Sequence, residues 1–332
     1  MKDDSLRGAP PYSDQAADQQ AAVSTEHIPV LADETLQGLR IRSGDWTIDG
    51  TLGGGGHAAR ILRQSEPDGH LLGLDADPAA IQRAKRRFTA EIAAGRMVAA
   101  HANFADVETV AKQHGFTGVH AILLDLGVSS FQLAEAERGF SLQADGPLDM
   151  RMNPDQEITA WDIVNTWSER DLADLIYEYG EERHSRRIAK TLVARRPIER
   201  TIQLAEIVEQ ALGGRRGQRI HPATRTFQAL RIGVNQELSR LEQALPQCLR
   251  LLRPGGRLAV ISFHSLEDRI VKRWIQQEAA DFLPDPAHPM GGVPKQPAVA
   301  IITRKPITAA DVELRHNPRS RSAKLRIAER IQ

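Results

Sequence analysis

Short apolar runs alternate with amphipathic stretches along the first part of the chain. After residue 45, apolar runs of strand length cover residues 46–49, 70–74, 97–100 and 119–124. Between them, apolar residues recur with helical spacing over residues 56–63, 78–88 and 104–114,. Because strands that alternate with helices need crossover connections, this pattern predicts a parallel α/β sheet.

The alternation stops after the fourth predicted strand and returns about 100 residues later, the usual size of an independent domain. Residues 135–235 show helical patterns, for example over residues 172–179, 186–194 and 204–212, and no clear strand. A helix predicted over residues 236–251 then leads to strands over residues 257–262, 298–303 and 323–328, and the last strands suit an antiparallel edge. Ser265 is the expected N-cap of the helix that follows residue 262. We predict one doubly wound domain, residues 26–134 and 236–332, interrupted by a helical insertion, residues 135–235.

Composition limits the class of protein. The 332 residues are 41% hydrophobic and 26% charged, which is ordinary for a soluble protein with a large core,. Residues 1–25 lack apolar periodicity and predict a disordered leader without the apolar core of a secretory signal. No run approaches the ~18 apolar residues that a membrane span needs. The single cysteine, Cys248, stands among leucines and predicts a buried thiol, and a cytoplasmic location is expected,.

A glycine cluster follows the first predicted strand. The residues run Ile48-Asp49-Gly50-Thr51-Leu52-Gly53-Gly54-Gly55-Gly56-His57 and lead into a predicted helix. Glycine lets the backbone turn sharply and approach a ligand closely, and ligands bind at the carboxyl ends of such strands. Turns also use glycine, so the cluster alone is weak evidence for a nucleotide site.

An acid at the end of the second predicted strand strengthens this interpretation. Asp75 lies about 20 residues after the loop, where a carboxylate can accept bonds from ribose hydroxyls. Asp77, directly before Pro78, is better suited to cap the next helix. Two cofactors remain open at this point. The spacing Gly53-x-Gly55-x-x-Ala58 also fits NAD, whereas Asp49, Asp125 and the antiparallel edge favour S-adenosylmethionine,.

Three longer stretches resemble one family. They are the loop from Asp49 to His57, the run Leu123-Leu124-Asp125-Leu126-Gly127-Val128-Ser129-Ser130-x-Gln132-Leu133, and Glu137-Arg138-Gly139-Phe140-Ser141 followed by Asp145-Gly146-Pro147-Leu148-Asp149-Met150-Arg151-Met152. Together they are similar to the bacterial 16S rRNA cytosine-N4 methyltransferases of the small-subunit methyltransferase H group, also called MraW. The resemblance runs from about His27 to the C-terminus. It implies a class I, Rossmann-like fold with an inserted helical domain.

The resemblance also implies an activity and its residues. The expected reaction is transfer of a methyl group from S-adenosyl-L-methionine to N4 of cytidine 1402 in 16S rRNA, a step of ribosome biogenesis. The expected partner is the small ribosomal subunit or its RNA, without a membrane, and the chain acts alone or as a homodimer. Cofactor contacts carried over from the family fall on Gly55, Gly56, His57, Asp75, Phe104, Asp125 and Gln132. Two departures are Gly54, where relatives often have a larger residue, and Phe131, where they often have proline.

Several side chains have two possible roles. The Phe104 ring either packs on adenine or belongs to the core. Asp125, or a nearby carbonyl, is the candidate acceptor for an N4 hydrogen of a base that has left its stack. His264 lines the target pocket or, as we expect, packs at a helix entry. No histidine or carboxylate spacing is typical of a metal site, so no metal is predicted.

Basic residues concentrate in the predicted insertion. Between residues 183 and 231, twelve basic residues face three acidic ones, a local charge of +9 in a chain whose net charge is zero. Such runs are often solvated helix faces, but arginine also suits phosphate contacts. With Arg315, Arg319, Arg321, Lys324 and Arg326 of the tail, they predict contact with RNA phosphates and a steep salt dependence. The basic residues of the insertion are Arg183, Arg186, Arg187, Lys190, Arg195, Arg196, Arg200, Arg215, Arg216, Arg219, Arg225 and Arg231.

Other functions remain open on sequence alone. An NAD-dependent oxidoreductase would share the glycine loop, and a non-catalytic RNA-binding assembly factor would share the basic segments. A DNA amino-methyltransferase is disfavoured because the Asp/Asn-Pro-Pro-aromatic sequence is missing after the fourth predicted strand.

Overall fold

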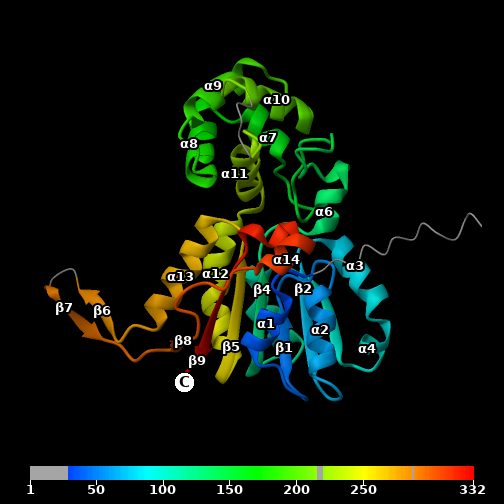
Figure 1. Ribbon diagram of the computed structural model, residues 1–332, viewed down its shortest axis with the longest axis vertical. Helices are drawn as coiled ribbons and strands as arrows, with labels where there is room; N and C mark the ends of the chain where they lie inside the picture. Colours follow the sequence, from blue (N-terminus) through cyan, green and yellow to red (C-terminus); the bar gives the residue numbers. More distant parts are fainter. Residues whose placement is uncertain (1–28, 215–219, 286–287) are drawn as a thin grey trace, which may run out of the picture.

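The computed structural model describes residues 29–214, 220–285 and 288–332 and consists of a sheet-containing body that carries a helical lobe (Figure 1). The predicted leader, residues 1–25, lies outside the described residues. Within the described ranges, no helix is long and apolar enough to cross a membrane.

Seven strands form the main sheet in the order β3-β2-β1-β4-β5-β9-β8. The first five strands of this order are parallel, whereas β9 pairs antiparallel with both β5 and β8. Both features confirm the sequence prediction. The bounds are β1 Trp46–Asp49, β2 His70–Asp75, β3 Met97–His101, β4 Val119–Asp125, β5 Leu252–Ser262, β8 Val299–Ile301 and β9 Lys324–Arg330. A separate hairpin of β6 (Phe282–Asp285) and β7 (His288–Pro294), absent from the sequence prediction, projects from the body (Figure 1).

Helices cover both faces of the sheet because strand side chains alternate between them. On β4, Leu124 belongs to the core shared with α5, α12 and α13, while its neighbour Leu123 belongs to the core shared with α1, α2 and α3. The strands are apolar on both faces, as is typical of buried parallel strands. The helices of the body are α1 Ala32–Leu39, α2 Gly56–Gln64, α3 Pro78–Arg87, α4 Thr89–Ala93, η1 Phe104–Asp106, α5 Val107–Gln113, α12 Glu237–Leu251, α13 Ser265–Glu278, α14 Asp311–His316 and η3 Pro318–Ser322.

The chain between β4 and α12 is helical and has its own apolar core. Ile163, Leu172, Ile188, Leu204 and Leu230 are buried there among one another's helices. The helices predicted over residues 172–179, 186–194 and 204–212 correspond to α8, α9 and α10; the division of the chain into domains stays a prediction. The helices of this segment are α6 Ser130–Ala134, η2 Ala136–Arg138, α7 Ala160–Thr166, α8 Glu169–Gly180, α9 Ser185–Ala194, α10 Thr201–Ala211 and α11 Thr224–Asn235.

The two connections of the lobe are bonded to each other. At the end of α11, the Asn235 amide donates to the Met150 carbonyl at 2.8 Å and accepts from the Met152 amide at 2.7 Å. Arg138 donates to the carbonyl of Met152 and to the carboxylate of Asp77, which follows β2. These bonds hold the base of the lobe above the carboxyl ends of the strands.

Two predicted helix caps have different outcomes. Asp77 caps α3 as predicted, since its carboxylate accepts from the Ala79 amide at 3.0 Å. The prediction for Ser265 is wrong: His264 is the N-cap of α13 and shares a capping box with Glu267. Ser265 is the first helical residue, and its hydroxyl donates to Glu181 of the lobe. The imidazole replaces the hydroxyl as acceptor, an exception to the usual preference for short polar caps.

Candidate functional site

A cavity of about 290 Å³ opens at the carboxyl ends of β1, β2, β4 and β5. It lies where the sheet order reverses between β1 and β4, the position at which open α/β sheets bind ligands,. The glycine loop after β1 forms one wall, and residues from the base of the lobe form another. Its size is close to the lower end of small-molecule pockets, roughly 300 Å³.

Hydrogen bonds from strand ends hold the glycine loop in place. The Asp75 carboxylate accepts from the Gly53 amide at 2.7 Å and from the Asp77 amide at 2.8 Å. Gly55 has φ +73°, and a Cβ there would lie 2.7 Å from the Phe88 ring. Glycine is therefore needed at this position both for its backbone conformation and for the close approach of the Phe88 ring,.

Three carboxyl groups meet at this edge, and each resists ionisation. Burial and, to a smaller extent, the charge of the nearby Asp75 raise the pKa of Asp49 to about 7 against the lowering effect of the bonds from Thr51. Burial likewise raises the pKa of Asp75 to about 6, against the opposing bonds from Asp77 and Gly53. The pKa of Asp125 lies well above its ordinary value because of burial and the charges of Asp49 and Glu267. A cationic ligand or hydroxyl donors would stabilise these carboxylates.

Asp125 lines the cavity and has one carboxyl oxygen without a hydrogen-bond partner among the described residues. Its amide donates to the Thr51 hydroxyl at 2.6 Å, which fixes the backbone at the end of β4. Its Oδ2 lies 3.7 Å from Nε2 of His57, and its Oδ1 has no hydrogen-bond partner among the described residues. The Asp125 side chain is 21% exposed and lines the cavity, whereas its Oδ1 is itself buried.

The structure brings together six of the seven predicted cofactor residues. Gly56, His57, Asp75, Phe104, Asp125 and Gln132 line the cavity. Gly55 does not belong to the lining; it lies behind the loop against Phe88 and acts through the backbone. Gly55 is the residue before α2, and its contact with a cofactor stays a prediction.

Two of the lining residues also have structural roles. The Gln132 amide nitrogen donates to Asp77 at 3.2 Å, and its oxygen accepts from the Ser129 amide at 2.9 Å, so both polar ends are bonded within the protein. Phe104 both lines the cavity and packs against the core beneath α5 and α12, so both predicted roles are compatible with its position. The Phe131 ring lies 4.4 Å from the Arg83 guanidinium carbon, and the turn at Gln132 forms a regular capping box.

The wall of the cavity opposite the sequence-predicted residues contains residues from both the lobe and the body that sequence analysis did not identify as site residues. Arg231, Glu237, Phe263, Glu267 and Arg319 all belong to the lining. They come from α11, α12, the end of β5, α13 and η3, which are far apart in sequence, so no local spacing signals them. Arg231 and Arg319 were assigned only to RNA phosphates.

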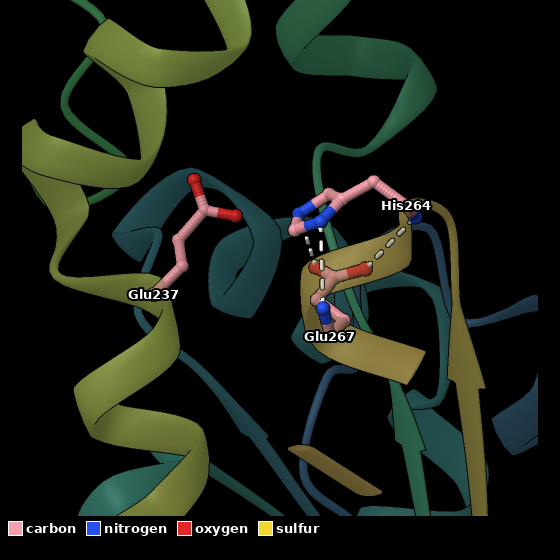
Figure 2. A group of neighbouring side chains, drawn as sticks. All are labelled: Glu237, His264 and Glu267. Carbon is pink, nitrogen blue, oxygen red and sulfur yellow. Dashed lines mark hydrogen bonds and ion pairs between the residues drawn. The ribbon is translucent and has the colours of Figure 1, made fainter. Parts of the chain in front are cut away.

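Glu237, His264 and Glu267 form a compact group beside the cavity (Figure 2). One ligand atom from each lies within 4.8 Å of the others, although the sequence shows no metal spacing. Protein partners already use these atoms: Arg231 binds Glu237, the Phe263 amide donates to Glu267 at 2.8 Å, and His264 lies 3.2 Å from Glu267. The absence of a required metal stays a prediction. His264 caps α13 and is absent from the cavity lining, which confirms the expected packing role.

The structure divides the predicted basic residues into two groups. Arg183, Arg186, Arg187, Lys190 and Arg195 are exposed on and beside α9, and no ion pair joins them to other described residues. Because residues three and four apart share a helix face, Arg186, Arg187 and Lys190 of α9 form one basic stripe, the α9 stripe,.

Other members of the set bind within the protein. Arg196 donates to the Val164 and Trp167 carbonyls, Arg200 pairs with Asp145, and Arg225 pairs with Glu182. In the tail, Arg326 is buried in an ion pair with Asp268 at 2.6 Å, so the expectation that it contacts RNA is wrong. Lys324 pairs with the same acid, while Arg319 lines the cavity. Arg215, Arg216 and Arg219 lie outside the described residues.

The buried thiol predicted for Cys248 is confirmed. Cys248 is inaccessible to solvent within α12, and burial raises its pKa to about 12. A thiol of this kind is a poor nucleophile, so it packs as a small apolar side chain.

The sheet order, the antiparallel β9 and the cavity beside the glycine loop define a Rossmann-like methyltransferase fold. Comparison with known proteins gives the family. A model described as the MraW methylase family matches residues 24–331, and the chain belongs to that family.

Similar proteins are named ribosomal RNA small subunit methyltransferase H. The one from Dehalococcoides mccartyi (strain ATCC BAA-2100) is 51% identical over 305 residues, 92% of this chain and 86% of that one. The one from Thermomicrobium roseum is 52% identical over 312 residues, 93% and 95% of the two chains. Among solved structures, an rRNA methylase from Streptococcus thermophilus aligns with a TM-score of 0.41 and 10% identity over 90% of this chain and 95% of that one.

Proposed function

We propose that this protein transfers the methyl group of S-adenosyl-L-methionine to the N4 amine of cytidine 1402 in 16S rRNA. The observation that carries the proposal is the juxtaposition of Asp125, which has an unpaired buried oxygen, with the glycine loop in one cavity. Membership of the MraW methylase family and the names of the relatives support the substrate class.

The residues of the cavity fit this methyl donor. Its sulfonium and ammonium groups are cationic, and Asp75 and Asp125 supply lining carboxyl groups whose ionisation a cation would favour,. Asp75 also suits the ribose hydroxyls, and the half-buried Phe104 ring suits the adenine,. An NAD-dependent oxidoreductase is the competing function, and equilibrium binding of the two cofactors to the full chain separates them.

The donor supplies an activated methyl group, so the protein must position the target amine and exclude water. The lone pair of cytosine N4 is delocalised into the ring. A carboxylate that accepts one N4 hydrogen orients the amine and makes the nitrogen more nucleophilic. We assign this role to the Asp125 carboxyl group, which lines the cavity at the end of β4 and whose Oδ1 has no hydrogen-bond partner among the described residues. The raised pKa of Asp125 is appropriate for a group that receives a proton,.

The α9 stripe is the proposed contact for RNA phosphates, and residues 135–235 are the proposed RNA-binding domain. The stripe is free of intramolecular ion pairs within the described residues, in contrast to Arg200 and Arg225. Lobe and body meet at the cavity, so RNA held by the lobe can deliver an unstacked base into it,. Assembly as a homodimer is a separate part of the proposal, which sedimentation of the full chain measures.

The decisive experiment is mass mapping of small-subunit RNA from cells that lack the protein and from cells that regain it. We expect N4 methylation at cytidine 1402 only when the wild-type chain is present. The variant Asp125→Asn should lose about 10²-fold or more in turnover, the usual contribution of a proton acceptor. The exposed Asp106→Asn serves as its control. Unmethylated RNA with the wild-type chain would refute the assignment to this position, and normal turnover of the Asp125 variant would refute the role of that residue. An assembly factor without catalytic activity would bind RNA and transfer no labelled methyl group.

A further inference from the structure

A fixed cationic donor faces the cavity from the base of the lobe. Arg231, near the end of α11, is 16% exposed at its side chain and lies among the lining residues. Its Nε and Nη2 donate to the two oxygens of Glu237, each at 2.8 Å. A two-point fork of this kind fixes the plane of the guanidinium, and Glu237 thereby acts as a positioning residue.

The third guanidinium nitrogen of Arg231, Nη1, takes no part in this fork. Nη1 lies 3.9 Å from the position that a Cβ would occupy at Gly127, two residues after Asp125. Among the described residues, no acceptor is bonded to Nη1. Gly127 has φ +92° and no side chain, so the space between the guanidinium and the loop after β4 stays open. The lining of the cavity therefore includes an acceptor, the Asp125 carboxyl group, and a donor, Arg231.

We propose that Arg231 Nη1 donates a hydrogen bond to ring nitrogen N3 of the target cytosine and so selects the base; this rests on the proposed function. In cytosine, N3 is an acceptor and is bonded to C4, which carries the N4 amine, a donor. Uracil and guanine present the opposite order at the corresponding atoms, a carbonyl acceptor beside an N–H donor. They would leave Nη1 unpaired against an N–H group, and buried unpaired donors are costly. Adenine presents the same order as cytosine, so this contact does not separate those two bases.

Two other roles for Arg231 make different predictions. As a simple tie between α11 and α12 through Glu237, it would affect all substrates equally. As a phosphate contact, it would weaken RNA binding without regard to the base. Only a contact to N3 makes the effect of the arginine depend on that atom.

The test combines a change in the protein with a change in the base. RNA containing the target position is made with cytidine or with 3-deazacytidine, which replaces N3 by C–H and keeps the amine. For the wild-type chain, we expect the analogue to reduce kcat/KM by about 10- to 100-fold, the usual discrimination of a good base contact. Arg231→Gln should lose a similar factor on cytidine and show little further loss with the analogue. Arg231→Lys, which keeps the charge without the fork, should behave in the same way, and Glu237→Gln should reduce the effect of the analogue partly.

The matched control is Arg225→Gln on the same helix, whose side chain is exposed, pairs with Glu182 and lies outside the cavity lining. It should retain the full effect of the analogue. Equilibrium binding of the two RNAs, measured with each variant, provides a second readout that is independent of turnover.

The outcomes separate the two proposals. Equal loss with the analogue in the wild-type chain and both Arg231 variants overturns the contact to N3 and leaves the proposed function intact. A wild-type chain that methylates no cytidine in this RNA overturns the proposed function itself, and the base contact falls with it. The intrinsic reactivity of the analogue cancels in this comparison, because it is the same for every variant.

Discussion

Replacing Asp49 by asparagine should make the stability of the free protein less sensitive to pH. Asp49 ends β1, is 1% exposed, and has its pKa raised from 3.8 to about 7, chiefly by burial. The folded protein therefore keeps a proton that the unfolded chain releases once the pH exceeds 3.8. Stability falls as the pH rises through this window and levels off above about 7,.

The magnitude follows from the shift of about three pKa units. Each unit corresponds to ~1.4 kcal/mol, so ionised Asp49 costs the fold up to about 4 kcal/mol above pH 7. Between pH 5 and pH 8 the wild-type chain should lose ~3 kcal/mol through this group alone. Asparagine does not titrate, and its side-chain oxygen can still accept from the Thr51 amide, now 3.1 Å from the carboxylate. The amide nitrogen adds an unsatisfied donor, but that cost is the same at every pH.

Denaturant unfolding of both chains at pH 5 and pH 8 measures the effect. The free energy of unfolding of Asp49→Asn relative to wild type should increase by ~3 kcal/mol between the two pH values. The exposed Asp106→Asn should track wild type at both. A difference between variant and wild type that is the same at pH 5 and pH 8 would refute the reasoning.

Three further predictions concern the glycine loop, the lobe and the edge of the sheet. Gly55→Ala places a side chain on a left-handed backbone and against the Phe88 ring, so it should destabilise the protein by ~1 kcal/mol or more beyond Gly95→Ala,. Gly95 also has a positive φ, +71°, but open space around its Cβ position. Denaturant midpoints compare the two variants, and equal losses of stability would contradict the close approach of Phe88. Arg187→Gln in the α9 stripe should weaken RNA binding and reduce the slope of log K against log salt concentration by about 1. Arg86→Gln, at an exposed position on α3, should leave both the affinity and this slope unchanged. A slope for the Arg187 variant that is identical to wild type would show that this residue makes no phosphate contact. Asp268→Ala leaves Arg326 buried without its carboxylate partner and should lower the free energy of unfolding by ~3 kcal/mol,. Asp33→Ala, which removes the partner of the more exposed Arg60, should lower it by less than ~1 kcal/mol,. Thermal unfolding measures both changes, and a small loss of stability at Asp268 would show that Arg326 finds another partner.

The parallel sheet was predictable because its signals are local. Each strand is a continuous apolar run, and the run at residues 119–124 differs from β4 by one residue. Asp77 before Pro78 identifies the start of α3 because capping depends on neighbours in sequence,. The hairpin of β6 and β7 was not predicted, since Pro284, Pro289, Gly291 and Gly292 interrupt its pattern. The N-cap at His264 was missed because the sequence also offers Ser265, a better capping residue by type.

The candidate site likewise consists of residues that local sequence signals locate and residues that only the tertiary fold brings together. Its glycine loop and the acids after β1, β2 and β4 could be located from sequence, because parallel strands bring all their carboxyl ends to one edge. The wall at the base of the lobe depends instead on how α11 returns to the body. Arg231 was indistinguishable in sequence from Arg187, yet one is clamped by Glu237 inside the cavity and the other faces solvent. In the two proposals above, the same residue type selects the base at one position and attracts phosphates at the other, and the direction of the side chain separates the two roles. An RNA-binding assay at varied salt should therefore be sensitive to Arg187, whereas discrimination between cytidine and its analogue should be sensitive to Arg231.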